Sequence, residues 1–270
     1  MKKLSILLST INDRIYAAES ILLQNFEDTE IIVVHQITES NTSEKYVSFY
    51  AKYDKDKIKF ISRFEKGTGR SRNCAMENAD GDLFYLCDDD LIFKEDFYRN
   101  IMEASAQFPS ADIMTFKVET TDNQPYKNYP VSSFPHNLRS SATVSIVEMV
   151  IRKAAYQKGL VNFDERFGLG TKYNTGEEFV MLSDGLKKGL KAVYVPEYLV
   201  QHPPISSGKI FNKEVAFDKG AMIAKVYGWK FLIIDGLFAI RKYREYKKSL
   251  GLFTFIYHIY KGSFKFLLNG

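Results

Sequence analysis

Cysteine is scarce in this sequence. Only two cysteines occur among 270 residues, Cys74 and Cys87, and the second lies inside a hydrophobic run that we expect to be buried. Two cysteines cannot build the disulfide framework of a small secreted protein, and neither has the spacing of a metal ligand. The composition therefore fits a protein of a reducing compartment.

Long hydrophobic runs are missing as well. No stretch approaches the ~18 uninterrupted apolar residues that a membrane-spanning helix requires. The start, MKKLSILLSTINDR, has two lysines and a short apolar run, but this run ends by Ile11 and charge returns at Asp13. That is too short for the core and cleavage site of a secretory signal. We expect this segment to be the first strand and the protein to be cytoplasmic.

Most of the chain has no excess of charge of one sign. The sequence holds 37 Lys and Arg against 33 Asp and Glu, a net charge of +4, but residues 241–265 contain seven basic residues and one acid, a local +6. This tail mixes aromatic residues with lysines, as interfacial helices do, and so predicts peripheral contact with an anionic membrane surface. The alternative is that its helices pack on the rest of the chain with their lysines in water, and the composition favours neither. We expect no nucleic-acid partner.

Strands and helices alternate in the predicted secondary structure. With 45% hydrophobic and 26% charged residues the chain is neither disordered nor fibrous. Apolar runs predict a central strand that begins at Leu83 and further strands at 4–10, 30–34, 58–61, 113–118, 143–151 and 191–195. Residues 65–72 are expected to be a glycine-bearing basic loop, and the pattern is helical from Asn212 onward. Four β-α units within the first ninety residues predict a parallel, doubly wound sheet with a binding crevice at the carboxyl ends of its strands.

The central strand ends in three carboxylates. In LFYLCDDDLIF, five apolar or aromatic residues from Leu83 lead directly into Asp88, Asp89 and Asp90. Adjacent carboxylates repel each other unless water or a cation neutralises them, and hard oxygen ligands suit Mg²⁺ or Mn²⁺. The pattern predicts a divalent-cation site, with a solvated acidic turn before a helix as the alternative.

Two further polar groups lie where an α/β sheet presents its loops. Glu177 and Glu178 follow Gly176 at a predicted helix start, and His202 precedes two prolines. Metal-assisted group transfer requires carboxylates for the cation, a separate base and often an imidazole, and all three are present. Each also has a structural interpretation, namely first-turn helix carboxylates and a loop histidine.

These segments together resemble the inverting family 2 glycosyltransferases of the GT-A fold. The opening strand LSILLSTIN is similar to that family's first strand, and GRSRNCAMENADGDLFYLCDDDLIF resembles its segment that leads through Gly-Asp into the acidic D-x-D motif. FDERFG followed by GEE resembles the acceptor-side loop and the acidic pair that supplies the base. The resemblance covers about residues 1–208.

The resemblance implies an α/β fold with a GT-A-like, doubly wound and mostly parallel sheet flanked by helices. It divides the chain into a GT-A domain at 1–208, with a nucleotide-sugar-binding half at 1–118 and an acceptor and catalytic half at 119–208. Residues 209–270 would form a C-terminal helical extension.

The resemblance also implies a role for nine residues. They are a catalytic base at Glu178 with Glu177 beside it, nucleotide-sugar contacts at Thr10, Gln36, Arg72 and Asp88, and metal ligation by Asp89, Asp90 and His202. Two departures from the family pattern bear on these roles. Residues 35–38 read His-Gln-Ile-Thr where the family has an acidic stretch that contacts uracil, and Gln36 could replace it by pairing with an imide edge. Cys87 stands where many members carry an acid, which leaves the register of the metal ligands open by one residue.

The implied reaction is a single displacement in which a sugar moves from a nucleoside-diphosphate sugar to a glycan acceptor. A UDP-sugar is the expected donor. The resemblance points to a lipid-linked acceptor in bacterial surface polysaccharide synthesis and to a hexosyltransferase.

Two other classes of protein remain open. An aspartate-dependent phosphohydrolase of the haloacid dehalogenase type also ends a strand in D-x-D, as Asp88 and Asp90 do, and a binding module could keep the fold without turnover.

Overall fold

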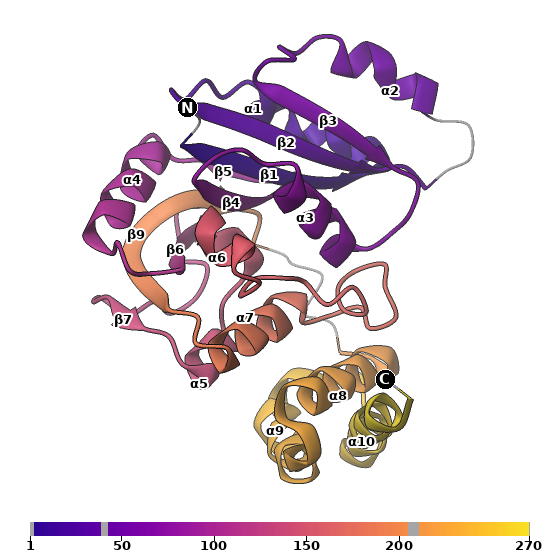
Figure 1. Ribbon diagram of the computed structural model, residues 1–270. Helices are drawn as coiled ribbons and strands as arrows, with labels where there is room; N and C mark the ends of the chain where they lie inside the picture. Colours follow the sequence, from indigo (N-terminus) through magenta and orange to yellow (C-terminus); the bar gives the residue numbers. More distant parts are fainter. Residues whose placement is uncertain (1–2, 39–42, 205–210, 270) are drawn as a thin grey trace.

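The computed structural model describes residues 3–38, 43–204 and 211–269. A twisted sheet with helices on both sides occupies the larger part of the molecule, and three helices near the C-terminus form a separate bundle below it (Figure 1). The mixed α/β, GT-A-like architecture and the C-terminal helical extension are therefore confirmed.

The first ninety residues alternate strand and helix as the apolar pattern predicts. The elements are β1 (Leu4–Ile11), a 3₁₀ helix (Asn12–Ala18), α1 (Glu19–Leu22), β2 (Thr29–Gln36), α2 (Ser43–Tyr50), β3 (Ile58–Arg63), α3 (Thr68–Glu77) and β4 (Leu83–Asp88). The expected basic loop at 65–72 is wrong in its second half, because α3 already begins at Thr68. Gly67, with φ of +140°, makes the turn into this helix.

The remaining sheet region is more irregular. It comprises β5 (Ile92–Phe93), α4 (Phe97–Gln107), β6 (Ile113–Thr120), β7 (Phe134–Pro135), α5 (Leu138–Ser141), a 3₁₀ helix (Ile146–Glu148), β8 (Met149–Arg152), α6 (Lys153–Gln157), α7 (Glu177–Lys187) and β9 (Ala192–His202). The strand predicted at 143–151 is wrong in its first part. A capping box between Ser145 and Glu148 makes that part a 3₁₀ turn, and only β8 joins the sheet.

The strand order β3-β2-β1-β4-β8-β6-β9-β5 places β1 and β4 in the middle of the sheet. β1, β2, β3 and β4 run parallel, whereas β8 is antiparallel to both of its neighbours. In the register of the parallel strands, Ser9 lies opposite Asp88 and Ile11 lies opposite Gln36. The carboxyl ends of these strands therefore meet at one edge, as expected for a binding crevice.

The C-terminal bundle consists of α8 (Lys213–Tyr227), α9 (Phe231–Tyr246) and α10 (Leu252–Asn269). α8 and α10 approach each other closely because both carry glycine at the crossing. A Cβ on Gly220 would lie 1.9 Å from the carbonyl oxygen of Ile259, and one on Gly262 would lie 1.9 Å from that of Phe217. Any larger residue at either glycine would force the two helices apart.

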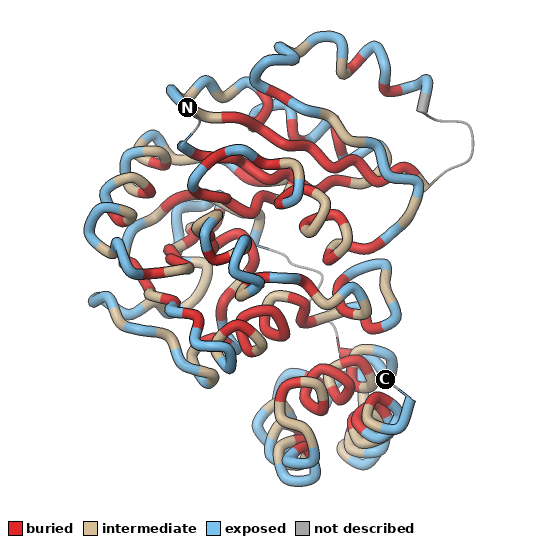
Figure 2. Tube along the Cα trace, in the orientation of Figure 1, coloured by how far each residue is buried: buried red, intermediate tan, exposed pale blue. Residues whose placement is uncertain are grey.

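Burial divides the interior into two clusters (Figure 2). The larger cluster fills both sides of the sheet. The second joins α8, α9 and α10 to residues that precede them, among them Phe167, Tyr173 and Val180. The bundle thus shares a core with the segment that leads into α7. The predicted domain boundary between 208 and 209 lies outside the described residues. Within the described ranges, no helix combines the length and the apolar character needed to cross a membrane.

Candidate active site

The Asp88–Asp90 cluster lies at the carboxyl end of β4, and its three carboxylates have different partners. Asp89 is buried, with 3% of its surface exposed, and its Oδ2 accepts a hydrogen bond of 2.7 Å from the Thr10 hydroxyl. Arg14 approaches the same carboxylate with Nε, 3.0 Å from Oδ1, and with Nη2. Both oxygens of Asp89 are thus engaged by protein groups.

Arg14 was not among the predicted site residues. It follows β1 within a 3₁₀ helix, and its Nη2 also reaches Oδ2 of Asp90 at 3.2 Å. Its bonds to Asp89 outweigh partial burial and raise the pKa of the guanidinium. The only signal in the sequence is a basic residue just beyond the first predicted strand, to which no role was assigned.

Arg72 joins the acidic cluster to the acidic pair. This α3 residue is buried, with only 5% of its side chain exposed. Its Nη1 donates to Glu177 Oε1 at 2.7 Å, and its Nη2 donates to Asp88 Oδ1 at 3.2 Å. Thr68, one turn earlier on α3, donates to the same oxygen of Glu177 at 3.2 Å. The start of α7 and the end of β4, almost ninety residues apart in the sequence, are therefore held together through one guanidinium.

The buried charges of this group shift one another's protonation. Burial raises the pKa of the Asp88 carboxyl, against the opposing charge of Arg72. Burial also acts on Glu177, but there Arg72 is stronger and the pKa is lowered. Burial alone would lower the pKa of Arg72, yet its two carboxylate partners raise it. Glu177 is thus an ionised ion-pair partner, which makes it a poor proton acceptor.

Glu178 is in a different position from its neighbour. It lies in the first turn of α7, is partly exposed, and burial together with the charge of Glu177 raises its pKa to about 7. A carboxylate with a pKa near neutrality is suited to general-base catalysis. The two adjacent glutamates therefore have distinct environments, one paired and ionised and the other ready to exchange a proton.

The first helix of the C-terminal bundle supports the segment in front of this pair. Lys219 of α8 donates to the Thr175 hydroxyl at 2.7 Å, and Asp218 accepts from the backbone N–H of Asn174 at 3.0 Å. Gly176, with φ of +78°, has no room for a side chain, because a Cβ there would lie 2.3 Å from Sδ of Met222. α8 lies outside the part of the chain that resembles the family, so no role for it was predicted.

His202 and Asp90 face each other across the end of the sheet. The His202 Nδ1 is 2.7 Å from the Pro203 carbonyl oxygen, so Nδ1 carries a proton and Nε2 is the ring nitrogen that can act as a metal ligand. This Nε2 is 3.6 Å from Oδ1 of Asp90, which is buried and has no hydrogen-bond partner among the described residues. A lone pair and an unsatisfied carboxylate oxygen that converge in this way fit a divalent cation.

Within residues 3–38, 43–204 and 211–269, no group of three or more His, Cys, Asp or Glu is arranged to hold a metal ion. Mg²⁺ is commonly bound through one or two carboxylates, with substrate phosphates and water completing its octahedron. The pair of Asp90 and His202 fits that pattern. Asp89 can join it only if Arg14 moves away.

Thr10 and Gln36 lie at the same edge of the sheet, at the ends of β1 and β2. The Thr10 hydroxyl is committed to Asp89, and Gln36 Oε1 accepts the backbone N–H of Gly67 at 2.7 Å. Gln36 therefore holds the turn that starts α3. Its amide N–H groups are the part of the side chain that remains for a ligand.

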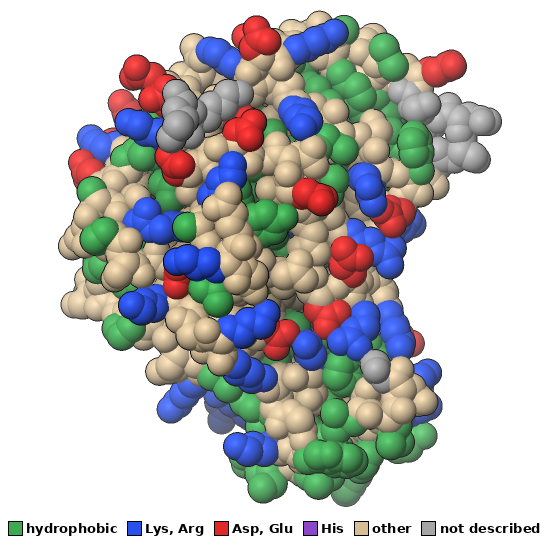
Figure 3. All heavy atoms as spheres, in the orientation of Figure 1, with side chains coloured by type: hydrophobic (Ala, Val, Ile, Leu, Met, Phe, Trp, Pro, Cys, Tyr) green, Lys and Arg blue, Asp and Glu red, His purple; other side chains and the backbone are tan. Residues whose placement is uncertain are grey.

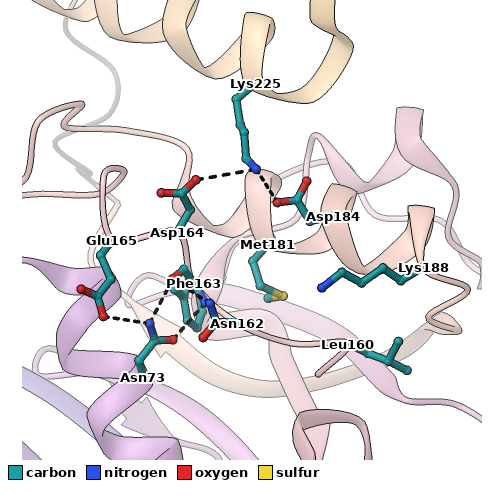
Figure 4. A pocket seen from close by; sticks show the side chains of 10 residues that line it. All are labelled: Asn73, Leu160, Asn162, Phe163, Asp164, Glu165, Met181, Asp184, Lys188 and Lys225. Carbon is teal, nitrogen blue, oxygen red and sulfur yellow. Dashed lines mark hydrogen bonds and ion pairs between the residues drawn. The ribbon is translucent and has the colours of Figure 1, made fainter. Parts of the chain in front are cut away.

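The segment FDERFG, residues 163–168, is fastened from two sides (Figure 4). Asn73 of α3 donates to the Phe163 carbonyl oxygen at 3.0 Å and to Glu165 at 3.3 Å. Lys225 of α8 lies 2.8 Å from Asp184 of α7 and 3.7 Å from Asp164. These groups border a polar cavity of about 370 Å³ beside α7. The segment that the resemblance assigns to the acceptor side is thus held between the sheet region and the C-terminal bundle.

Comparison with solved structures shows where the fold recurs. The chain is similar to a crystal structure of S. aureus TarS 1–349, with a TM-score of 0.59 and 15% identity over 98% of this chain and 83% of that one. It is similar to TarS 1–349 in complex with UDP-GlcNAc, with a TM-score of 0.62 and 15% identity over 93% and 76% of the two chains. For TarS 1–349 in complex with UDP the TM-score is 0.58 at 16% identity, with the same coverage. At such identities the likeness concerns the fold alone.

The sequence itself carries the family assignment. A search among curated proteins found no significant match. The profile of the family described as "Glycosyl transferase family 2" matches residues 15–160, which is more than half of the chain and includes β2, β4, the Asp88–Asp90 cluster and Arg72. The chain belongs to glycosyl transferase family 2 and is a glycosyltransferase.

Proposed function

We propose that this glycosyltransferase is metal-dependent and inverting, and that it moves a hexosyl group from a nucleoside-diphosphate sugar to a glycan acceptor. One observation carries the proposal. Arg72 binds Asp88 at the end of β4 and Glu177 at the start of α7, so the donor-side carboxylates and the acidic pair belong to one site. A single displacement requires this proximity, because the hydroxyl that the base deprotonates attacks the same anomeric carbon from which the diphosphate leaves.

The donor is proposed to be a UDP-sugar, lying over the carboxyl ends of β1, β2 and β4. Solved structures of similar fold are titled as complexes with UDP-GlcNAc and with UDP, which supports this class of donor. Asp88 is proposed to contact the ribose or diphosphate and Gln36 the base through its amide N–H groups. Arg72 would offset charge that develops on the diphosphate as it leaves, and Thr10 would lie beneath the base.

The cation is proposed to be Mn²⁺ or Mg²⁺, held by Asp90 and His202, with Asp89 as an additional ligand. When bound, it would supply a positive charge that stabilises the leaving diphosphate. His202 fits this role because its Nδ1 proton is occupied by the Pro203 carbonyl. Asp89 is bonded to Thr10 and Arg14, so it would join the other two ligands only after Arg14 had moved away.

Glu178 is proposed to be the general base. Its pKa of about 7 lets it exist as a carboxylate at neutral pH and still accept a proton from an acceptor hydroxyl. Glu177 is the positioning residue beside it, held ionised by Arg72. The hydroxyl then attacks the anomeric carbon from the face opposite the diphosphate, and the configuration inverts.

The acceptor is proposed to be a lipid-linked glycan that takes part in surface polysaccharide synthesis. The reaction is proposed to take place inside the cell. The free thiols of Cys74 and Cys87 fit a reducing compartment. Residues 1–208 are proposed as the glycosyltransferase domain, with the donor half at 1–118, the acceptor half at 119–208 and the extension at 209–270. Membership of glycosyl transferase family 2 argues against the alternative hypothesis of a dehalogenase-type phosphohydrolase.

A panel of nucleotide sugars tests the proposal. The full chain is incubated with each donor and Mn²⁺ in the presence and absence of EDTA, and release of nucleoside diphosphate is measured. Turnover with one UDP-sugar that disappears with EDTA and with Glu178→Gln supports the proposal. Donor binding without release in the presence of oligosaccharide acceptors would favour a binding module, and full turnover in EDTA would refute the metal dependence.

A further inference from the structure

Exposed hydrophobic side chains are concentrated on the C-terminal bundle. Ten of the seventeen large hydrophobic side chains that are exposed in the described part of the chain lie between residues 229 and 268. Figure 3 shows hydrophobic side chains gathered at the lower end of the molecule, over the bundle. Patches of this extent on a soluble protein mark a surface that binds something.

On α9 the exposed apolar residues share one side of the helix. Ile233, Leu237 and Ile240 follow one another at helical spacing and are exposed by 70%, 62% and 69%. Leu232 lies beside them and is half exposed. The opposite side of α9 is buried in the bundle, so this helix is apolar towards the core and towards solvent.

α10 repeats the arrangement. Phe253, Tyr257, Phe264 and Leu268 recur at spacings of four, seven and four, which places them in one stripe, and Phe253 is 85% exposed. The buried residues of α10, such as Ile259, lie on the other side of the helix. Burial against the bundle therefore leaves this stripe without a partner in the described structure.

The two stripes form one surface. The Tyr260 hydroxyl of α10 donates to the Leu232 carbonyl oxygen of α9 at 2.6 Å. The rings of Phe231 and Phe264 lie 4.9 Å apart, edge to face. The exposed residues of α9 and α10 thus adjoin along the contact between the helices, and we call this surface the apolar face.

Basic residues surround the apolar face. On α10, Lys261 and Lys265 are exposed one turn apart beside the stripe. Arg244 in the last turn of α9 and Lys247, the residue after the helix, are exposed beyond Ile240 and on the same side. Residues 241–265 carry seven basic residues and a single acid, Glu245.

We propose that the apolar face of α9 and α10 docks on an anionic lipid bilayer, with its apolar side chains at the boundary between headgroups and acyl chains and its basic rim on the headgroups. The chemistry matches that of interfacial helices, which combine a lipid-facing apolar side with flanking Lys and Arg. A second copy of the chain fits less well, since a symmetric contact would bring two regions of net charge +6 together. This docking is independent of the donor and base proposed above, and it can fail or hold separately.

Sedimentation with vesicles tests the proposal on the full chain. Vesicles of phosphatidylcholine with about a third phosphatidylglycerol are compared with pure phosphatidylcholine, at low and high salt. The test variant is the double change Leu237→Asp and Phe253→Asp, at two exposed positions whose loss leaves the core intact. The matched control is Val131→Asp, a 92% exposed apolar residue in the loop between β6 and β7. Circular dichroism and thermal unfolding confirm that the variants fold.

The wild type and the Val131→Asp control are expected to sediment with anionic vesicles and to be released by salt, and the double variant is expected to stay in solution. Replacing Lys261 and Lys265 by glutamine should lower the partition coefficient roughly 30-fold, since each basic residue near such a surface contributes about five-fold. Equal binding of the double variant and the wild type, or no binding by the wild type, would overturn the proposal. A dimer in analytical ultracentrifugation that the double variant abolishes, without vesicle binding, would assign the apolar face to a second copy instead.

Discussion

Replacement of Glu178 by glutamine should lower turnover and at the same time stabilise the protein above neutral pH. The side chains have nearly the same shape, so donor binding should stay close to that of the wild type. Loss of a general base typically costs ~10² to 10⁴-fold in rate, which corresponds to roughly 3 to 5 kcal/mol. A base acts in the transition state and hardly in the ground state, so the loss should appear in kcat.

The stability effect follows from the pKa. Burial and the charge of Glu177 raise the pKa of Glu178 from 4.5 to about 7. The folded protein therefore holds this proton more tightly than the unfolded chain. The stability that the protonated group contributes is complete below pH 4.5 and is lost as the pH rises through 7. At roughly 1.4 kcal/mol per pKa unit the loss reaches about 3 kcal/mol, and glutamine avoids it.

Two measurements on the same variant check this reasoning. Nucleoside-diphosphate release is followed from pH 5.5 to 9, where kcat/KM of the wild type should rise about tenfold per pH unit below 7 and level off above it. Urea unfolding at pH 5 and pH 8 should show Glu178→Gln more stable than the wild type at pH 8 only. A variant with wild-type turnover, or one less stable at pH 8, would refute the assignment of the base.

Glu177→Gln is the matched control, and its effect on stability has the opposite sign. The pKa of Glu177 is lowered, so its ionised form stabilises the fold at neutral pH and this contribution is lost on acidification. Glutamine leaves the buried Arg72 with Asp88 as its one carboxylate partner. We expect the free energy of unfolding at pH 8 to fall by about 1 to 3 kcal/mol. If Glu177→Gln were the inactive variant and Glu178→Gln the active one, the base would be Glu177.

Three further outcomes are expected. Asp90→Asn should raise the Mn²⁺ concentration required for half-maximal turnover at least tenfold. The melting temperature should change little, because Oδ1 has no hydrogen-bond partner among the described residues and the ion pair of Oδ2 with Arg14, at 3.2 Å, is exposed. An unchanged metal requirement would exclude Asp90 as a ligand. Arg14→Ala should lower the free energy of unfolding by about 1 to 2 kcal/mol in urea titrations, since it leaves the buried Asp89 carboxylate with fewer donors, and Arg14→Lys should restore part of this. Gly176→Ala should destabilise the protein by about 1 to 3 kcal/mol, because of the left-handed φ and the clash with Met222. Adding Met222→Ala should relieve the clash but not the backbone strain, so a partial rescue would separate the two causes. A wild-type melting temperature for Gly176→Ala would contradict the geometry.

The order of elements and the chemistry of the strand end could be predicted from the sequence alone. Apolar runs of strand length, separated by helical spacing, identify β1 to β4 because the burial of a parallel sheet on both faces requires such runs. The Asp88–Asp90 cluster at the end of β4 and the acidic start of α7 at Glu177 are local features and were predicted at their observed positions. The strand predicted at 143–151 was wrong in its first part, because the capping box between Ser145 and Glu148 stabilises a 3₁₀ helix there in place of a strand.

Contacts between distant residues were decided only by the tertiary structure. That Arg72 reaches both Asp88 and Glu177, and that Arg14 occupies Asp89, depends on how β1, β4, α3 and α7 meet, which no local pattern encodes. The different protonation of Glu177 and Glu178 has the same origin. Both are affected by burial, but Arg72 lowers the pKa of Glu177, whereas the charge of Glu177 raises the pKa of Glu178. For α9 and α10, the composition shows that apolar and basic residues are present. Only the packing of the bundle determines which apolar residues remain exposed, because a helix that is apolar on two sides can bury either side.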